Sequence, residues 1–349
     1  MAEKLGIGII GSGAIASGAH LPGYEAVSNR CRVLAVADID ADRAAKFAKD
    51  NNIPKAFSDY RQLLDLDEID AVSVCTPPAV HAPATIDALN AGKHVMCEKP
   101  MAMNAVEAAA MVEAARENGK VLAIDFQTRF GREPQLLKQI IDDGELGEIY
   151  FARTVYNRRR GIPAWGVFHI REHSGGGALM DLGVHMLDLT LWLMGHPKPV
   201  SVLGATYTKL GKRDDVFNPW GKWKTDEFDV EDFALATVNL EGGASLVLET
   251  SWALNIEKSQ QVVQLCGDRG GADLFPLRVY KDSGTALMDW TPSELSEGPP
   301  EHVASMGDFV GAILDDRSPL IIGDHGLMVA RIVDALYQSA ESGELVRLD

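Results

Sequence analysis

Short apolar runs alternate with amphipathic segments over the first third of the chain. Apolar runs of this length between turn residues predict buried strands, and the segments between them predict helices that cross back over a sheet. The expected strands are 5–10, 33–38, 70–77, 94–98 and 121–125, with helices at 40–49, 79–91 and 104–118. This order is typical of an α/β fold with a doubly wound parallel sheet.

The pattern changes after residue 126. A helix expected at 132–143 is followed by runs that alternate apolar and polar residues, as in an antiparallel sheet with one covered face. These runs are 148–157, 200–208, 233–240, 244–251 and 261–266, and a last helical pattern covers 326–340. We therefore predict two domains, 1–126 with the parallel sheet and 127–349 with an α+β fold and an open antiparallel sheet.

A glycine-rich turn joins the first expected strand to residues that can continue as a helix. In the Rossmann dinucleotide-binding turn, the first glycine permits the tight bend, the second lets the backbone approach a pyrophosphate, and a small third residue packs helix on strand. The N–H groups at the helix start then bind phosphate. The residues that fit this turn, with Ala16 in the small third position, are Gly11, Ser12, Gly13, Ala14 and Ile15.

Asp38 ends the second expected strand, about 20 to 25 residues beyond the glycines. An acid at this position receives the ribose hydroxyls and repels a 2′-phosphate, which favours NAD over NADP. Arg43 lies five residues further on, and a nearby arginine can serve a 2′-phosphate. Its alternative interpretation is a surface residue of the helix at 40–49.

Polar residues also follow the ends of the other expected strands. Thr76 and Pro77 end one strand, Glu98 and Lys99 end the next, and Gln127 follows the last. Ligands of doubly wound sheets bind at the carboxyl ends of the strands. An isolated Glu-Lys pair is usually a solvated surface feature, but this position predicts a lysine beside a nicotinamide.

Asp181 and His185 lie four residues apart in the run 175–188. On a helix they share one face, where a carboxylate and an imidazole can grip a hydroxyl together. Asp188 can hold the imidazole in one tautomer, and the glycines before Asp181 are expected to leave room for a ligand. The alternative is a structural ion pair. We reject a metal site, because no third ligand stands at helical or hairpin spacing.

In this order the motifs resemble those of the NAD(P)-dependent sugar oxidoreductases typified by glucose-fructose oxidoreductase and inositol dehydrogenase. The resemblance spans nearly the full chain and rests on the glycine turn, Thr76-Pro77 with His81, Glu98-Lys99-Pro100 and the run 175–188. It implies that Lys99 and His185 flank the reacting carbon, that Asp181 binds substrate hydroxyls, and that His81 belongs to the cofactor site. It also implies a homodimer or homotetramer formed through the open sheet.

The expected function is that of a NAD-dependent sugar or polyol oxidoreductase. His185 is expected to take the hydroxyl proton as hydride leaves carbon, since an imidazole exchanges a proton near neutral pH. Lys99 is expected to stabilise the developing alkoxide. Two alternatives stay open. One is a NAD-dependent glycosidase that oxidises a sugar carbon transiently, eliminates the aglycone and returns the hydride, and the other is a sensor that binds NAD and sugar without catalysis.

A basic cluster before the run 175–188 bears on the substrate. Arg158 and Arg160 are expected to clamp a carboxylate, sulfonate or phosphate, and Trp165 to stack on a sugar ring or the nicotinamide. The alternatives are a solvated turn, ion pairs with the acids at 226–232, and a core position for the tryptophan. Residues 218–223 carry two further tryptophans, as a lid or an oligomer contact.

Composition restricts the partners of the chain. The 349 residues carry a net charge of −17, which argues against nucleic acid and anionic membranes as partners. There is no signal-like segment at the start and no apolar run long enough to span a bilayer. The four cysteines form no Cys-x-x-Cys and are expected to be reduced. We expect a soluble cytoplasmic enzyme with a small carbohydrate as its substrate.

Overall fold

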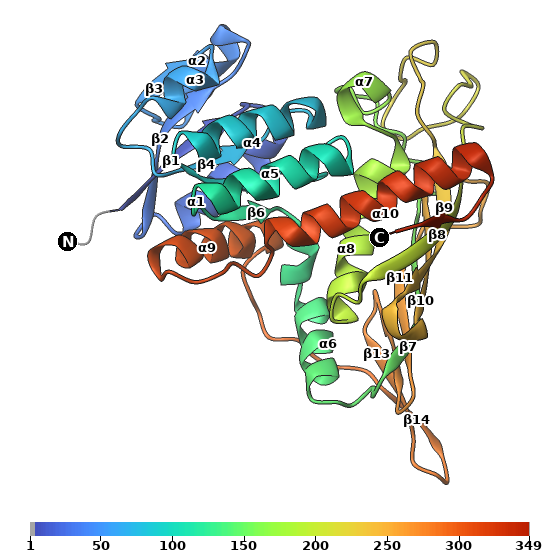
Figure 1. Cartoon of the computed structure of the whole chain (residues 1–349). Coiled ribbons are helices and arrows are strands. Elements are labelled where there is room, and N and C mark those ends of the chain that lie inside the picture. Colours follow the sequence, from blue (N-terminus) through green and yellow to red (C-terminus); the bar gives the residue numbers. More distant parts are fainter. Residues whose placement is uncertain (1–3, 349) are drawn as a thin grey trace. The chain divides into compact units, whose positions relative to one another are not determined.

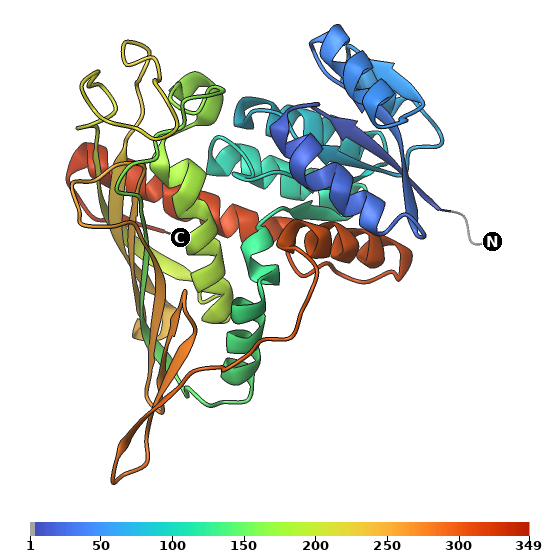
Figure 2. The ribbon, with the colours of Figure 1, turned by 180° about the vertical axis from the view of Figure 1, so that it is seen from behind.

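The computed structural model describes residues 4–348 and divides into two compact units. The first comprises the chain up to Phe130 together with Pro299–Leu327, and the second comprises Gly131–Gly298 and the chain from Met328 onward (Figures 1 and 2). From the sequence we expect a single boundary at residue 126. The structure differs because a helix in the late segment packs into the core of the first unit.

The first unit is built on a six-stranded sheet in the order β3-β2-β1-β4-β5-β6, and every neighbouring pair is parallel. This confirms the doubly wound parallel sheet. The strand order reverses between β1 and β4, where such sheets bind their ligands. The strands are β1 Leu5–Ile10, β2 Cys31–Ala37, β3 Lys55–Phe57, β4 Ala71–Val74, β5 His94–Cys97 and β6 Leu122–Ile124.

Helices cover both faces of this sheet. Ile7 of β1 packs with Tyr24 and Phe309 on one face, whereas a side chain at Gly8 would run into Leu63 on the other. Successive strand residues point to opposite faces, so these contacts fix helices on both sides. The helices are α1 Leu21–Ala26, α2 Ala41–Asp50, α3 Tyr60–Leu64, α4 His81–Asn90, α5 Ala105–Glu117 and α9 Glu301–Leu314, with a π-helical segment at Ala16–His20 and 3-10 turns at Pro78–Val80 and Gln127–Phe130.

The second unit contains a nine-stranded sheet in the order β14-β13-β12-β11-β7-β10-β9-β8-β15. All neighbouring pairs are antiparallel except β7 and β10, which are parallel. This confirms the α+β prediction, with four additional strands, β12 to β15. The strands are β7 Ile149–Asn157, β8 Pro199–Tyr207, β9 Phe233–Leu240, β10 Ser245–Ser251, β11 Gln260–Gly267, β12 Gly271–Leu274, β13 Arg278–Asp282, β14 Leu287–Trp290 and β15 Val346–Arg347.

One face of this second sheet is covered and the other is open. On β8, a side chain at Gly204 would meet Leu336, whereas Leu203 is 48% exposed. Helix α8 packs on the covered face against β7. The helices are α6 Arg132–Asp142, α7 Arg171–Ser174, α8 Val184–Leu193 and α10 Gly323–Ser342, with a π-helical segment at Leu179–Gly183 and a 3-10 turn at Glu241–Gly243. None of the helices within residues 4–348 has the length and apolar character that a membrane crossing requires.

Candidate active site

The glycine turn after β1 has the geometry of a phosphate-binding loop. Gly11 has a φ of +93°, and a Cβ there would lie 2.7 Å from the carbonyl oxygen of Cys75, so the bend requires glycine. A Cβ at Gly13 would meet nothing within 4 Å. The backbone at Gly13 is therefore open to a ligand, as the dinucleotide motif requires.

Asp38 follows β2 and is tied to the glycine turn. Its carboxylate accepts hydrogen bonds from the Ser12 backbone N–H and hydroxyl, each at 2.8 Å, and from Nε of Arg43 at 3.0 Å. Burial alone would raise the pKa of this carboxyl, but the hydrogen bonds from Arg43 and Ser12 outweigh burial and lower it to about 2. Arg43 is thus a surface residue of α2, as expected, and its half-exposed guanidinium is held by Asp38.

Two further side chains predicted at the strand ends carry buried polar atoms. Oγ1 of Thr76 and Oε1 of Gln127 are buried and have no hydrogen-bond partner among residues 4–348. Buried polar atoms are normally satisfied, so these two atoms fit a bound group that supplies hydrogen bonds. Together with the open backbone at Gly13, they make this edge of the sheet suitable for a dinucleotide.

His81, which we expect in the cofactor site, lies between two backbone carbonyl oxygens. Its ring is 1% exposed, and its nitrogens lie 2.7 Å from the carbonyl oxygen of Pro100 and 2.8 Å from that of Thr76. The imidazole therefore links the end of β4 to the turn after Lys99. Its role in the structure is to hold the backbone of the site.

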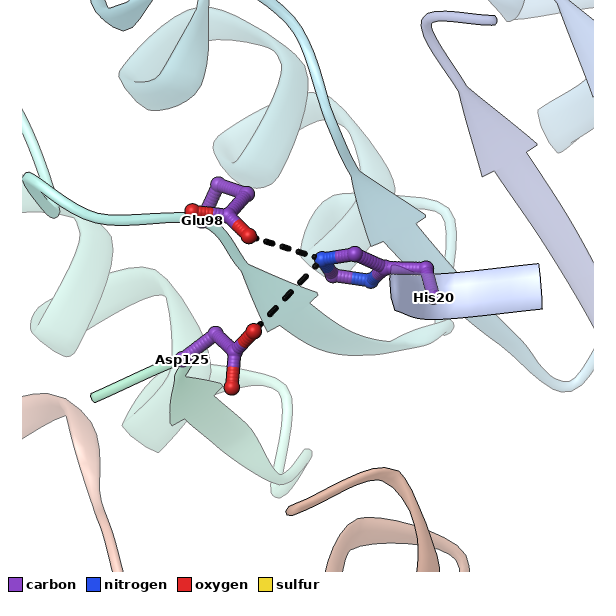
Figure 3. A group of neighbouring side chains, drawn as sticks. All are labelled: His20, Glu98 and Asp125. Carbon is purple, nitrogen blue, oxygen red and sulfur yellow. Dashed lines mark hydrogen bonds and ion pairs between the residues drawn. The ribbon is translucent and has the colours of Figure 1, made fainter. Parts of the chain in front are cut away.

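Lys99 follows β5 at the carboxyl edge of the sheet, and a buried carboxylate holds its backbone. Oε2 of Glu98 accepts the Lys99 backbone N–H at 3.0 Å, while Oε1 lies 3.0 Å from Nε2 of His20. The same imidazole nitrogen lies 3.7 Å from Oδ2 of Asp125 (Figure 3). Nδ1 of His20 contacts the hydroxyl of Ser73 at 3.0 Å.

Charge in this buried cluster is balanced by histidines. Burial alone would lower the pKa of His20, but the neighbouring Cys75 and Glu98 raise it well above its usual value. Nδ1 of His302 lies 2.8 Å from Oδ2 of Asp125, the oxygen that His20 also faces. Burial would raise the pKa of Asp125, whereas His302 and His20 lower it.

The ligand atoms of His20, Glu98 and Asp125 lie within 4.8 Å of one another, close enough to hold a metal ion. The sequence does not reveal this cluster, because its members are separated by 78 and 27 positions. A protonated His20 between the two carboxylates satisfies them in the way that a cation would.

Asp181 lies in the π-helical segment that runs into α8, and His185 lies in the first turn of α8. The run is helical, as predicted, but its first turn is π rather than α. Oδ2 of Asp181 accepts a hydrogen bond from Nε1 of Trp252 at 2.9 Å and lies 4.0 Å from Nη1 of Arg158. Asp188, one turn beyond His185, is buried.

The glycines before Asp181 serve the packing of the chain and not, as we expect from the sequence, the approach of a ligand. A Cβ at Gly176 would lie 1.9 Å from the hydroxyl of Tyr337, and one at Gly177 would lie 1.9 Å from the carbonyl oxygen of Glu231. Oε1 of Glu231 accepts the backbone N–H groups of Gly177 and Leu179, both at 2.9 Å. Glu231 thus fixes the start of the helix, a role that sequence reasoning missed.

The basic cluster after β7 divides into two parts. Arg160 donates to the carbonyl oxygen of Leu254 and to Oδ1 of Asn255. These atoms, rather than the acids at 226–232 named as an alternative to the anion clamp, hold its guanidinium. Arg158 instead reaches Asp181, as described above. Trp165 is 53% exposed, which excludes the alternative of a core position.

Sequence comparisons assign both units to known families. A model described as "Oxidoreductase family, NAD-binding Rossmann fold" matches residues 5–126, and a model of the GFO/IDH/MocA C-terminal domain matches residues 135–273. D-glucoside 3-dehydrogenase of Escherichia coli (strain K12) is 39% identical over 349 residues, which cover 99% of this chain and 98% of that protein.

Solved structures agree with this assignment. Aldose-aldose oxidoreductase from Caulobacter crescentus, complexed with glycerol, is 26% identical with a TM-score of 0.82, over 99% of this chain and 100% of that chain. Levoglucosan dehydrogenase in complex with NADH shares the fold, with 24% identity and a TM-score of 0.85 over 99% of this chain and 100% of that chain. The chain belongs to the GFO/IDH/MocA family of oxidoreductases, whose N-terminal unit is a NAD-binding Rossmann fold.

Proposed function

We propose that this protein oxidises a secondary hydroxyl of a glycoside, sugar or polyol. The observation that carries the proposal is Lys99 at the carboxyl edge of a Rossmann sheet, with its backbone held by the buried Glu98. The likeness over nearly the full chain to D-glucoside 3-dehydrogenase supports a glucoside as the substrate and its C3 hydroxyl as the reacting group. NAD, when bound, accepts the hydride from the oxidised carbon.

We assign a chemical role in this oxidation to each of the residues predicted at the site, according to its charge and its ability to exchange a proton. Lys99 stabilises the negative charge that develops on the substrate oxygen, and His185 takes the hydroxyl proton. Asp181 accepts hydrogen bonds from substrate hydroxyls, since its carboxylate is oriented by Trp252. Asp188 orients the imidazole.

The cofactor is held by the residues around the glycine turn. The backbone from Gly11 to Ile15 receives the pyrophosphate, and Asp38 receives the ribose hydroxyls. Thr76 and Gln127, whose buried polar atoms have no partner among residues 4–348, bind the nicotinamide half.

Formation of NADH from methyl glucoside, free sugars and polyols tests the proposal directly. We expect Lys99→Ala and His185→Ala each to lower kcat by about a hundredfold or more, because both act on charge that develops in the transition state. Both variants are expected still to bind NADH, which can be measured through the fluorescence of NADH. Lys49→Ala, a change on the exposed face of α2, serves as the matched control and keeps wild-type turnover.

Three outcomes would contradict the assignment. Wild-type turnover in His185→Ala would remove the proposed base and leave Lys99 as the group that moves the proton. Release of an aglycone with catalytic NAD and no accumulation of NADH would indicate a hydrolytic outcome. Cofactor binding without turnover of any sugar, glycoside or polyol would indicate a sensor.

We also propose that the protein acts as a homodimer or homotetramer in the cytoplasm, assembled through the open face of the second sheet. Apolar side chains on that face, Leu203 and Tyr207, are 48% and 41% exposed. All four cysteines are unpaired, which fits a reducing compartment. We assign cofactor binding to a domain at 1–126, and substrate binding and oligomerisation to a domain at 127–349. The segment around α9 is the exception, because it packs with the first unit.

A further inference from the structure

Two tryptophans form an exposed aromatic surface in the second unit. Trp165 and Trp220 are 53% and 42% exposed, and their ring centroids are 5.3 Å apart with an angle of 53° between the planes. They come from two loops that are more than 50 residues apart in the sequence. Large aromatic rings are usually buried, so an exposed pair of this kind is typical of a binding surface.

The loop that carries Trp220 is anchored to the protein. Trp223 is 8% exposed and donates from Nε1 to the carbonyl oxygen of Gly211 at 2.6 Å. Nδ2 of Asn218 donates to the carbonyl oxygen of Ile162 at 2.9 Å, which ties this loop to the one that carries Trp165. The loop on either side of Trp220 is therefore held in place, which lowers the entropy cost of binding a ligand there.

Arg158 connects the aromatic surface to the carboxylate of Asp181. Its guanidinium lies over the ring of Trp220, 4.8 Å from the centroid, and Nη1 lies 4.0 Å from Oδ2 of Asp181. Nη1 also donates to the carbonyl oxygen of Gly161 at 3.1 Å, which holds the side chain in place. The carboxylate and the aromatic surface are thus separated by the width of one guanidinium group.

We propose that Trp165 and Trp220 form a subsite for the group attached to the sugar that Asp181 binds. The ligand class is a glycoside whose aglycone presents a flat apolar face, either an aryl group or the C–H face of a second hexose ring. Indole rings bind such faces through apolar contact and through their negative π-surface. The inference rests on the proposed function, because it takes Asp181 as the residue that holds the oxidised sugar.

The arginines beside this surface are held by oxygen atoms of the protein. Arg158 already has the Asp181 carboxylate and the Gly161 carbonyl oxygen as partners. Arg159 donates to the carbonyl oxygen of Glu257, and Arg160 to that of Leu254. These contacts hold the arginine side chains in place, and the exposed aromatic rings provide the surface for the ligand.

A comparison of phenyl glucoside with methyl glucoside of the same anomeric configuration tests the subsite. We expect Trp220→Ala and Trp165→Ala each to lower kcat/KM for phenyl glucoside by about tenfold, mainly by raising KM. The kcat/KM for methyl glucoside should change by less than about threefold. Phe217→Ala is the control, because Phe217 is 74% exposed and lies in the same loop. It should leave both substrates unchanged.

An equal loss of kcat/KM for both glucosides, or no loss of kcat/KM for either, would overturn the proposed subsite. So would a changed oligomeric mass in Trp220→Ala without a changed preference between the glucosides, because the surface would then be a contact between copies. Equilibrium binding of phenyl glucoside, measured by isothermal titration calorimetry, separates this inference from the proposed function. If the wild-type protein turns over neither glucoside, the proposed reaction fails, and loss of phenyl glucoside binding in Trp220→Ala still decides the subsite.

Discussion

At the scale of single residues, we propose that the pair formed by Asp38 and Arg43 distinguishes NAD from NADP. Asp38 remains ionised throughout the neutral range, because its pKa is lowered to about 2. Arg43 is held by this carboxylate with its side chain 51% exposed. We expect the carboxylate to repel a 2′-phosphate and to keep the Arg43 guanidinium from binding one.

We expect wild-type protein to bind NAD more tightly than NADP, and Asp38→Ala to narrow the gap by raising NADP affinity about tenfold. The released guanidinium can then donate to the 2′-phosphate. The double variant Asp38→Ala with Arg43→Ala should lose that gain, as measured by cofactor titration. Equal NADP affinity in the single and double variants would show that Arg43 takes no part.

Residue-scale contacts were only partly predictable from the sequence. Asp38 and Lys99 were predictable because each follows a recognisable buried strand, and the edge of a parallel sheet is where ligands bind. His20 and Glu231 were not, since their partners lie more than 50 positions away and a single sequence does not reveal such pairs. The glycines before Asp181 were recognised, but their neighbours Tyr337 and Glu231 come from distant segments.

At the scale of elements, the π-helical segment Ala16–His20 connects the glycine turn with the end of β5, which Lys99 follows. It ends at His20, whose ring contacts Ser73 of β4 and the carboxylates that follow β5 and β6. One buried imidazole thus joins the ends of three adjacent strands.

This arrangement makes the stability of the first unit depend on pH. Because the pKa of His20 is raised, its protonation stabilises the folded state. This stabilisation is complete at a pH below the usual pKa of 6.5, and it is lost as the pH rises through the pKa of His20 in the folded protein. The groups that face the ring are Glu98, Asp125, Cys75 and Ser73. The lowered pKa of Asp125 matters at acidic pH. The stabilisation that its ionised carboxylate gives the folded state is lost as the pH falls below about 3.8.

His20→Gln is expected to lower the free energy of unfolding by about 3 kcal/mol at pH 6, because it leaves buried carboxylates without their charged partner. The difference from wild type should shrink toward alkaline pH, where the wild-type imidazole also loses its proton. Chemical denaturation across this range measures it, with Lys46→Gln on the exposed face of α2 as a control. A difference that is constant with pH would contradict the role of the imidazolium.

Elements with a long, clear pattern were predicted from the sequence, and short or atypical ones were not. Strand β9 was expected at 233–240 and lies at Phe233–Leu240, because eight alternating residues define a covered and an open face. Strand β12 has only four residues. Helix α9 contains Gly307 and Gly311, which have low helix propensity, and it forms because its apolar residues complete a distant core.

At the scale of the whole molecule, the open face of the second sheet determines the expected assembly. Leu203 and Tyr207 alternate along β8 on this face, and Tyr207 stacks on Phe233 of β9 with centroids 5.6 Å apart. Exposed apolar side chains on adjacent strands form a continuous patch that a second copy can cover.

We expect light scattering to give the mass of a dimer or tetramer, and Leu203→Glu to shift it toward the monomer, because a buried carboxylate without a partner is costly. Val106→Glu on α5 is the matched control, since Val106 is 80% exposed and lies in the other unit. A wild-type monomer at micromolar concentration, or an unchanged mass in Leu203→Glu, would exclude this face as the interface.

Helix α9 gives the first unit a discontinuous sequence, and this has an evolutionary consequence. Met306 and Phe309 of α9 complete the core that Ile7 and Tyr24 begin, although nearly 300 positions separate them. A gene fragment that ended after β6 would encode a sheet with one apolar face that α1 covers only in part. The two units therefore cannot be exchanged between proteins as separate modules by a single crossover, and descent with both units together is the simpler route for this architecture.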